Sequence, residues 1–239
     1  MEEIKIRALG VGAVEIKTCR NRIFVDAQNS FNETEILDEG DILIFTHDDA
    51  DHFDASKLQN IKDLNIKIIG PPSIVKPIIK EDKARIDQIV AIYSQNNNNP
   101  ASIEFDEIII TSLTTPHFNH WNAIHNSYLI QIKNRRVFVT GDSLLTKEVS
   151  ELIGNIDVAI CNLVDEGYLT GKGEPRHAFH HLLSYLLSIM SDCKPGRIIG
   201  THLINFDGTV DAKTLKKLIE DYQFSNIIIP IATDEIICI

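Results

Sequence analysis

The sequence is poor in the features that mark secreted or membrane proteins. It holds only four cysteines, which are far apart and form no CxxC pair: Cys19, Cys161, Cys193 and Cys238. We therefore expect reduced thiols in or near the core rather than a disulfide framework. The N-terminus has no basic region followed by an apolar stretch, and no segment approaches the ~20 apolar residues that span a bilayer. A cytoplasmic location without membrane contact is the expectation.

Basic residues are also scarce, with 23 Lys and Arg against 34 Asp and Glu and a formal net charge of -11. An acidic surface repels phosphate backbones, so nucleic acid is not an expected partner, and a small-molecule substrate fits better. The apolar fraction of 44% is ordinary for a chain that forms a sizeable core. No internal repeat is visible, and we expect one domain over residues 1–239. The oligomeric state stays open, a homo-oligomer included.

Short runs of β-branched residues dominate the sequence and predict many strands. Strands are expected at 4–9, 14–18, 23–26, 42–45, 67–69, 108–113, 127–132, 137–140, 158–161, 197–199, 227–230 and 235–239. Helices are expected at 54–59, from Pro71-Pro72 onward, and at 82–93, 144–152, 176–191 and 212–222. The Asn-rich stretch 96–100 is interpreted as a surface turn. This order favours an α/β four-layer αββα sandwich over a doubly wound parallel sheet.

The densest group of candidate metal ligands directly follows the expected strand 42–45. The run Thr46-His47-Asp48-Asp49-Ala50-Asp51-His52 offers four such side chains, namely His47, Asp49, Asp51 and His52. A loop at the end of a rigid strand can aim alternate side chains at one point, while the adjacent Asp51 and His52 can serve a second point. Imidazole and carboxylate donors suit Zn, Mn or Fe. Taken alone, the run fits a solvated acidic turn equally well, because aspartate favours turns.

Three further residues of ligand type follow expected strands. His117 ends Thr-Thr-Pro-His, Asp142 lies in Thr-Gly-Asp-Ser, and His202 ends Gly-Thr-His. A single residue in such a place is more often structural. Because strand ends at one edge of a sheet can converge on a single cleft, four such places in one chain indicate a shared site.

The order and spacing of these residues resemble the metallo-β-lactamase superfamily. Its signature is a T-H-x-H-x-D-H loop, followed by a His, an Asp in a T-G-D context and a final His. The match covers nearly the whole chain and begins at the strand end Phe24-Val25-Asp26. The small size and the stretch from Pro116-His117 to Trp121 are similar to the compact cytoplasmic branch that includes ascorbate-phosphate lactonase. The resemblance implies a metal-dependent hydrolase.

The resemblance also implies a two-metal site. Its ligands form two triads and a bridge: His47, Asp49 and His117 for the first ion, Asp51, His52 and His202 for the second, and Asp142 between them. Two divalent ions that share a water lower its pKa and give a metal-bound hydroxide as the nucleophile. Asp51 would orient this hydroxide and Asp142 would fix the distance between the ions, so these two are the expected catalytic carboxylates.

One position departs from the superfamily pattern, because Asp49 stands where the signature has His. A carboxylate in that place resembles the flavodiiron branch. It makes the first site harder and more anionic, which favours manganese or iron over zinc. It also makes a non-haem di-iron redox role conceivable, although the sequence contains no flavodoxin-like domain to pass electrons.

Three functions are therefore compared. The leading one is hydrolysis of an ester, lactone, thioester or phosphoester of a small metabolite, with the substrate inferred by analogy alone. The second is a non-haem di-iron redox protein. The third is a metal-binding module without catalysis, which the full set of ligand positions argues against. Antibiotic degradation is not expected, because such enzymes are exported and the chain has no signal peptide.

Residues near His117 are candidates for contacts with the substrate. His120 and Trp121 are predicted to line the pocket, with His120 as a proton donor to the leaving group. A structural loop whose aromatic residue packs under the site explains this stretch equally well. His125 is a weaker candidate for the same pocket.

A second group of basic side chains lies later in the chain. His177, His180 and His181 share one face of the expected helix 176–191. Lys172 lies in a Gly-Lys-Gly loop. Exposed surface positions are the simpler interpretation for all four.

Overall fold

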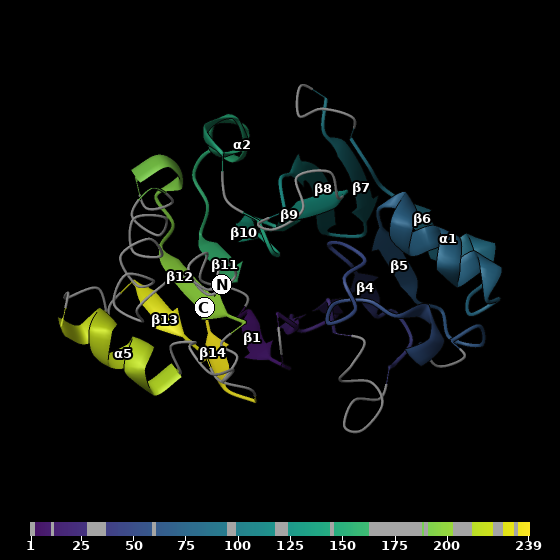
Figure 1. The fold of residues 1–239 in the computed structure, drawn as a ribbon, viewed down its shortest axis with the longest axis horizontal. Helices are drawn as coiled ribbons and strands as arrows, with labels where there is room; N and C mark the ends of the chain where they lie inside the picture. Colours follow the sequence, from purple (N-terminus) through teal and green to yellow (C-terminus); the bar gives the residue numbers. More distant parts are fainter. Residues whose placement is uncertain are drawn as a thin grey trace. The chain divides into compact units, whose positions relative to one another are not determined.

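The computed structural model describes residues 3–10, 12–27, 37–58, 61–94, 99–117, 124–143, 146–162, 188, 191–202, 212–221, 227–231 and 234–239. The chain divides into two compact units. Unit 1 comprises Met1–Tyr93 and Ala232–Ile239, and unit 2 comprises Ser94–Ile231. Each unit contains one seven-stranded sheet (Figure 1). The boundary adjoins the Asn-rich stretch interpreted above as a surface turn. The single domain expected over 1–239 stays a prediction.

The sheet of unit 1 is mixed. In spatial order its strands are β14 (Ile236–Cys238), β1 (Lys5–Ala8), β2 (Val14–Lys17), β3 (Arg22–Val25), β4 (Ile42–Ile44), β5 (Lys67–Gly70) and β6 (Ile89–Ala91). The pairings from β14 to β3 are antiparallel and those from β3 to β6 are parallel. Parallel pairing places the carboxyl ends of β3 and β4 at the same edge. The residues that follow these two strands are therefore neighbours.

The helices of unit 1 are short. They are η2 (Ala55–Lys57), α1 (Pro72–Lys80) and η3 (Ile86–Gln88). Proline is tolerated at the start of α1 because the first amide of a helix has no intrahelical acceptor. The apolar face of α1, with Ile74 and Ile78, is buried against β5 and β6.

The prediction of a helix at 82–93 is wrong, because this stretch forms η3 and β6 instead. The buried Gln88 side chain donates hydrogen bonds to the carbonyls of Ile61 and Leu64. Ile89 and Val90 then pair with β5 in parallel register. The helical spacing of apolar residues in this stretch is overridden by pairing with a strand about twenty residues earlier, and β-branched side chains suit that environment.

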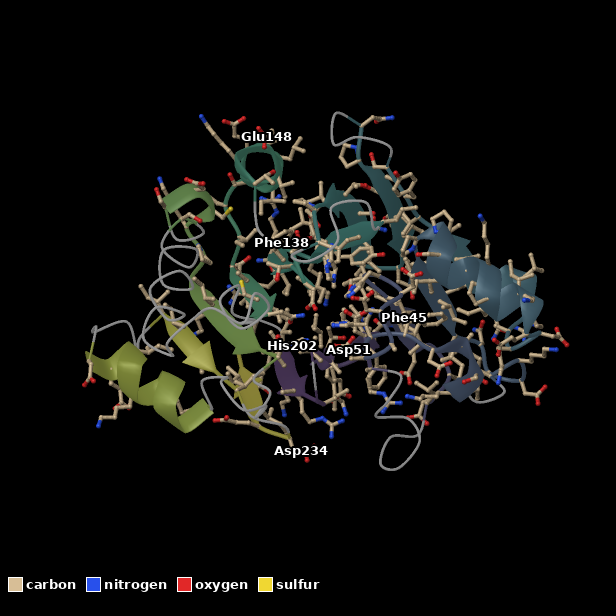
Figure 2. The ribbon with its side chains drawn as sticks, viewed as in Figure 1. Phe45, Asp51, Phe138, Glu148, His202 and Asp234 are labelled. Atoms are coloured by element: carbon tan, nitrogen blue, oxygen red, sulfur yellow. The ribbon has the colours of Figure 1, made fainter. Side chains whose placement is uncertain are left out.

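Aromatic packing fixes both ends of the ligand-rich run in unit 1. Phe45 precedes the run and Phe53 follows it, and both are buried. Their rings meet edge to face with centroids 5.0 Å apart, a geometry worth about 0.5–1.5 kcal/mol beyond burial. Figure 2 shows Phe45 among the side chains of this unit. The segment between the two rings is therefore closed into a compact loop.

The sheet of unit 2 is also mixed. In spatial order its strands are β13 (Ile228–Pro230), β12 (Arg197–Thr201), β11 (Val158–Asn162), β10 (Arg135–Val139), β9 (His125–Ile132), β8 (Ile108–Thr115) and β7 (Ala101–Phe105). The pairings from β13 to β10 are parallel and those from β10 to β7 are antiparallel. It follows that β8, β10, β11 and β12 run in one direction and end at one edge.

The other elements of unit 2 agree with expectation only in part. Strand β7 was not predicted. Its side chains alternate between half-buried and exposed, so it lacks a continuous apolar run. Helix α2 (Lys147–Ile153) begins three residues later than expected, where the hydroxyl of Thr146 accepts a hydrogen bond from the amide of Val149. Helix α5 (Ala212–Asp221) lies where predicted. Most of the helix expected at 176–191 lies outside the described residues.

Two mixed sheets with accompanying helices confirm the predicted α/β fold class. Within the described part of the chain, no helix has both the length and the apolar character needed to cross a membrane.

Candidate metal centre

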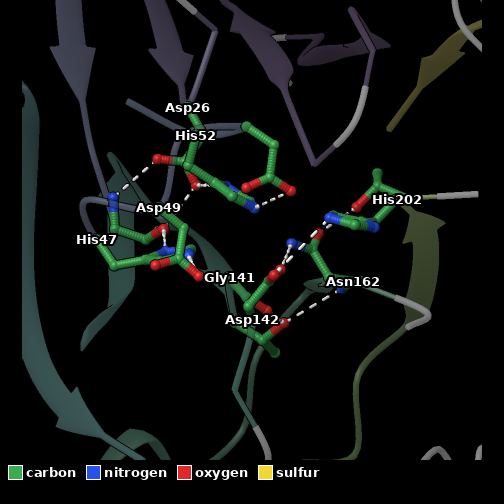
Figure 3. Close-up of polar contacts among 12 residues, drawn as sticks. Asp26, His47, Asp49, His52, Gly141, Asp142, Asn162 and His202 are labelled. Carbon is green, nitrogen blue, oxygen red and sulfur yellow. Dashed lines mark hydrogen bonds and ion pairs between the residues drawn. The ribbon is translucent and has the colours of Figure 1, made fainter. Parts of the chain in front are cut away.

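Unit 1 brings four predicted ligands together in the loop that follows β4. His47 and His52 are fully buried, and their ring centroids are 4.2 Å apart. The side chain of Asp49 is 39% exposed and that of Asp51 is 50% exposed. The loop thus holds two buried imidazoles and two partly exposed carboxylates, and Figure 3 shows His47, Asp49 and His52 of this loop.

Both imidazoles are fixed through Nδ1. Nδ1 of His47 lies 2.8 Å from the hydroxyl of Thr46, and Nδ1 of His52 lies 3.0 Å from a carboxylate oxygen of Asp26. The Thr46 hydroxyl donates its only hydrogen to Asp26 at 2.6 Å. It must therefore accept from His47, and the Asp26 carboxylate accepts from His52. Each ring then carries its hydrogen on Nδ1, so Nε2 is the nitrogen with the lone pair, as in histidines that bind metal ions.

The separations between ligand atoms fit metal binding. Nε2 of His47 lies 3.6 Å from Oδ2 of Asp49, and Nε2 of His52 lies 3.7 Å from Oδ2 of Asp51. Two ligands that contact one tetrahedral zinc ion at its usual bond lengths are about 3.4 Å apart. Each histidine therefore forms a pair with one aspartate at a spacing close to that of two ligands of one ion.

Asp26 supports this loop from the end of β3. Its carboxylate is 1% exposed and accepts hydrogen bonds from the Thr46 amide, the Thr46 hydroxyl and His52. Asp26, His47 and His52 also place possible ligand atoms within 4.8 Å of one another. Because three hydrogen bonds already engage the carboxylate, and because it faces Nδ1 of His52, Asp26 is placed to position the histidines.

Unit 2 holds the other three predicted ligands, His117, Asp142 and His202. His117 follows β8, and its backbone forms an isolated bridge with Ser143, next to Asp142. His202 follows β12, and its Nε2 lies 3.7 Å from Oδ2 of Asp142. All three side chains are buried. His202 and Asp142 therefore form a third pair with the spacing of ligands, and His117 lies close to it along the sheet edge.

Left-handed backbone positions occur at three of the strand ends that carry these residues. Asp26, Gly141 and His202 have φ values of 51°, 59° and 61°. This left-handed region suits glycine and is tolerated by Asp and His more readily than by bulky residues. These three residues follow β3, β10 and β12, so a left-handed backbone position stands at or beside Asp26, Asp142 and His202.

Asp142 has its own support in unit 2. Oδ1 of Asp142 accepts a hydrogen bond of 2.5 Å from the amide of Asn162, at the end of β11. The Asn162 oxygen accepts one of 2.7 Å from the hydroxyl of Thr201, at the end of β12. Sequence reasoning located Asp26 only as a strand end and missed Asn162. No local spacing indicated either role, because their partners are 20 to 39 residues away along the chain.

His125 lies within β9 and is fully buried. Its Nδ1 lies 2.8 Å from the Thr115 hydroxyl, and its ring meets that of His117 edge to face with centroids 5.7 Å apart. It is a strand residue beside a predicted ligand rather than part of a loop. The remaining candidates, His120, Trp121, Lys172, His177, His180 and His181, lie outside the described residues.

Comparison with known proteins identifies the family. A family model described as a beta-lactamase superfamily domain matches residues 21–203, a span that includes all seven predicted ligands. A comparison with curated proteins finds no match.

Solved structures share the fold across the full chain. The chain is 15% identical to Igni18, a metallo hydrolase from the archaeon Ignicoccus hospitalis, with a TM-score of 0.68 over 99% of this chain and 98% of that one. It is 17% identical to YhfI from Bacillus subtilis, a metallo-β-lactamase fold protein, with a TM-score of 0.67 over 100% of both chains.

A third structure differs in length and chemistry. CmlA from Streptomyces venezuelae, a diiron β-hydroxylase, is 13% identical with a TM-score of 0.68 over 100% of this chain, which spans only 54% of CmlA. At these identities, the likeness to solved structures shows the fold alone. Because the family model covers most of the sequence, the chain belongs to the beta-lactamase superfamily and has the metallo-β-lactamase fold.

Proposed function

We propose that the chain is a metal-dependent hydrolase that cleaves an ester, lactone, thioester or phosphoester of a small metabolite. The observation that carries this proposal is the paired arrangement in the loop after β4. His47 is paired with Asp49 and His52 with Asp51, at 3.6 and 3.7 Å between Nε2 and carboxylate oxygen. Two fixed imidazoles that each face a separate carboxylate support two ions rather than one.

We assign the ligands as the sequence predicted them. The first ion is held by His47, Asp49 and His117, the second by Asp51, His52 and His202, with Asp142 as the bridge. This assignment combines ligands of both units and is part of the proposal. It is supported by the burial of all four histidines and by the family match over the segment that contains every ligand.

Two divalent ions, when bound, convert water to a nucleophile near neutral pH and polarise the oxygen of the scissile bond. Asp51 has a half-exposed side chain, so it can also accept a hydrogen bond from the attacking water and orient it. Asp142 is buried and held by Asn162, so it keeps one geometry while substrate enters. The two carboxylates therefore act in different ways, Asp51 on the water and Asp142 on the ligand frame.

The preferred metal follows from the donor set, whereas the substrate class is inferred by analogy. The carboxylate of Asp49 makes the first site harder, so we expect manganese or iron in preference to zinc. We propose a substrate class like that of the ascorbate-phosphate lactonase branch, with His120 and Trp121 in contact with it. A cytoplasmic location and the absence of nucleic-acid partners remain predictions from charge and composition.

A second candidate is a non-haem di-iron redox protein. The specific observation in its favour is the Asp49 carboxylate beside His47 Nε2, at the position where the superfamily signature has histidine. The structural neighbour CmlA is a diiron β-hydroxylase, which makes iron chemistry compatible with the fold. Oxidative chemistry requires a source of electrons, whereas hydrolysis requires none.

The deciding experiment is elemental analysis of protein purified without added metal, followed by a substrate screen. Chelator-treated protein is reloaded with manganese, zinc or iron and assayed on lactones, thioesters and phosphodiesters. Hydrolysis that depends on reloading, and that is lost in Asp51→Ala, supports the leading proposal. Iron with visible absorbance that changes on reduction, without hydrolysis, supports the second candidate. Failure of the wild-type protein to bind any of the three metals would overturn both.

A further inference from the structure

We infer that Asn162 is a positioning residue that reserves one oxygen of Asp142 and leaves the other for the metal ion. This role rests on the proposed function, because it concerns the same site. Asn162 is the last residue of β11 and is 2% exposed. Nothing about its sequence position marks it, and it belongs to none of the predicted ligand motifs.

The hydrogen bonds of Asn162 fix its orientation unambiguously. The carboxylate of Asp142 can only accept in its ionised form, so the atom 2.5 Å from Oδ1 must be the amide nitrogen. The amide oxygen then faces the hydroxyl of Thr201, which donates at 2.7 Å. Rotation of the amide by 180° would place its oxygen 2.5 Å from a carboxylate oxygen, and two acceptors cannot form a hydrogen bond. The pair of contacts is consistent in one orientation only.

The two oxygens of Asp142 are therefore not equivalent. Oδ1 is taken by the amide of Asn162, whereas Oδ2 lies 3.7 Å from Nε2 of His202. That spacing is close to the value of about 3.4 Å for two ligands of one tetrahedral zinc ion. Oδ2 would therefore be the oxygen that holds an ion beside His202, while Oδ1 is engaged by the amide of Asn162.

Asn162 also links three strand ends into one frame. Its backbone amide donates to the Thr140 hydroxyl after β10, and its side chain accepts from Thr201, its partner in register on β12. Thr201 directly precedes His202. The hydrogen bonds therefore run from Asp142 through Asn162 to Thr201, the neighbour of His202. They set the placement of Asp142 relative to His202.

An amide suits this role better than a carboxylate. Aspartate at position 162 would place a second carboxylate against Asp142 in a buried site, and the two could not both ionise at that distance. The amide donates the same hydrogen bond and adds no charge. Removal of such a supporting contact weakens metal binding about 10–100-fold in known metal sites.

The test measures metal binding in the full chain, independent of turnover. Chelator-treated protein is titrated with Co²⁺, and affinity and the visible absorption spectrum are recorded for the wild type and Asn162→Leu. We expect about 10–100-fold weaker binding and an altered spectrum. The matched control is Asn126→Leu, which removes a buried asparagine of β9 whose amide donates to the Tyr128 hydroxyl instead. It should bind Co²⁺ like the wild type.

A second pair of variants covers the case in which Asn162→Leu does not fold. Thr201→Val removes the donor that orients the amide, whereas Thr201→Ser keeps it. We expect weaker Co²⁺ binding in the valine variant and recovery in the serine variant. A folded Asn162→Leu with wild-type affinity and spectrum, or a Thr201→Val that matches Thr201→Ser, would overturn the positioning role. If the wild type itself binds no Co²⁺, Mn²⁺ or Zn²⁺, the proposed function fails first.

Discussion

The two units follow the same sheet plan but hold their predicted ligands in different ways. Each has seven strands, with parallel pairing on one side and antiparallel pairing on the other. Unit 1 gathers four ligands in one loop of seven residues, whereas unit 2 places one ligand after each of three separate strands. The first arrangement is local in sequence, and the second depends on contacts between strands.

The supporting residues differ accordingly. Unit 1 uses a buried carboxylate, Asp26, which anchors one loop through Thr46 and His52. Unit 2 uses a neutral amide, Asn162, which ties strand ends together through Asp142 and Thr201. A buried charge gives strong hydrogen bonds but is costly if its partners are lost, whereas an amide supports a carboxylate without adding charge. In unit 1, one buried side chain is enough to hold a single loop through its hydrogen bonds. In unit 2, the three strand ends are held in place by hydrogen bonds from one strand to the next.

The largest effect expected is on turnover, from loss of one ligand in either unit. Asp51→Ala in unit 1 and His117→Ala in unit 2 should each lower kcat by about 10³-fold or more, because each removes a proposed ligand of one of the two ions that would activate water. Asp48→Ala is the matched control in the same loop, since Asp48 is exposed and is not a predicted ligand. Turnover is measured on whichever substrate the screen identifies, with circular dichroism to confirm folding. Near-normal activity in either purified variant would refute the ligand assignment.

The next effect is on stability and concerns the charged anchor of unit 1. Asp26→Asn keeps the shape but replaces one carboxylate oxygen by an NH2 group, which cannot accept the hydrogen bonds that Thr46 and His52 donate. We expect the metal-free protein to lose about 3 kcal/mol of unfolding free energy in urea. The control is Asp38→Asn, because the Asp38 side chain is 73% exposed and its ion pair with Arg22 contributes little. Equal unfolding midpoints for the two variants would show that Asp26 does not anchor the loop.

The same contrast explains what the sequence could predict. The four ligands of unit 1 lie within six residues, so their spacing is visible in the chain itself. Most strands were located to within a residue or two, because β-branched runs such as that of β4 form buried parallel strands. His117, Asp142 and His202 were found by the expectation that strand ends converge, helped by the family resemblance.

Long-range contacts explain what the sequence could not predict. The roles of Asp26 and Asn162 depend on partners brought close only by strand pairing. The segment that became β6 has helical spacing but pairs with β5, and β7 has no buried run to mark it. In each case tertiary contact decides between alternatives that local pattern leaves open.

A smaller effect concerns the metal preferred by unit 1. Asp49→His restores the superfamily pattern and replaces a hard carboxylate by imidazole beside His47. We expect preference to shift toward zinc over manganese, on the order of tenfold, as imidazole suits zinc better than manganese. The measurement is competition between the two metals for chelator-treated protein, followed by elemental analysis. Asp48→His serves as the control, and an unchanged ratio in Asp49→His would show that position 49 does not contact the metal.

The smallest effect expected is on thiol reactivity, which should differ between the cysteines of the two units. Cys19 and Cys238 in unit 1 are exposed, whereas Cys161 and Cys193 in unit 2 are buried. Burial raises the pKa of the Cys161 thiol, and burial raises that of Cys193 to about 11. A raised pKa leaves little reactive thiolate below pH 9. With a disulfide reagent at pH 8, we expect Cys19 and Cys238 to react fast and the other two only on unfolding.

The labelling rate also reports on the strand that carries the positioning residue. Cys161 directly precedes Asn162 on β11, so its thiol becomes accessible only if this strand opens. In Cys19→Ser combined with Cys238→Ser, the fast phase should vanish while the slow phase persists. If Cys161 then reacted as fast as the exposed thiols of the wild type, the end of β11 would be open much of the time. The amide of Asn162 on such a strand could not hold Asp142 in one geometry. The proposed positioning role of Asn162 would then be wrong.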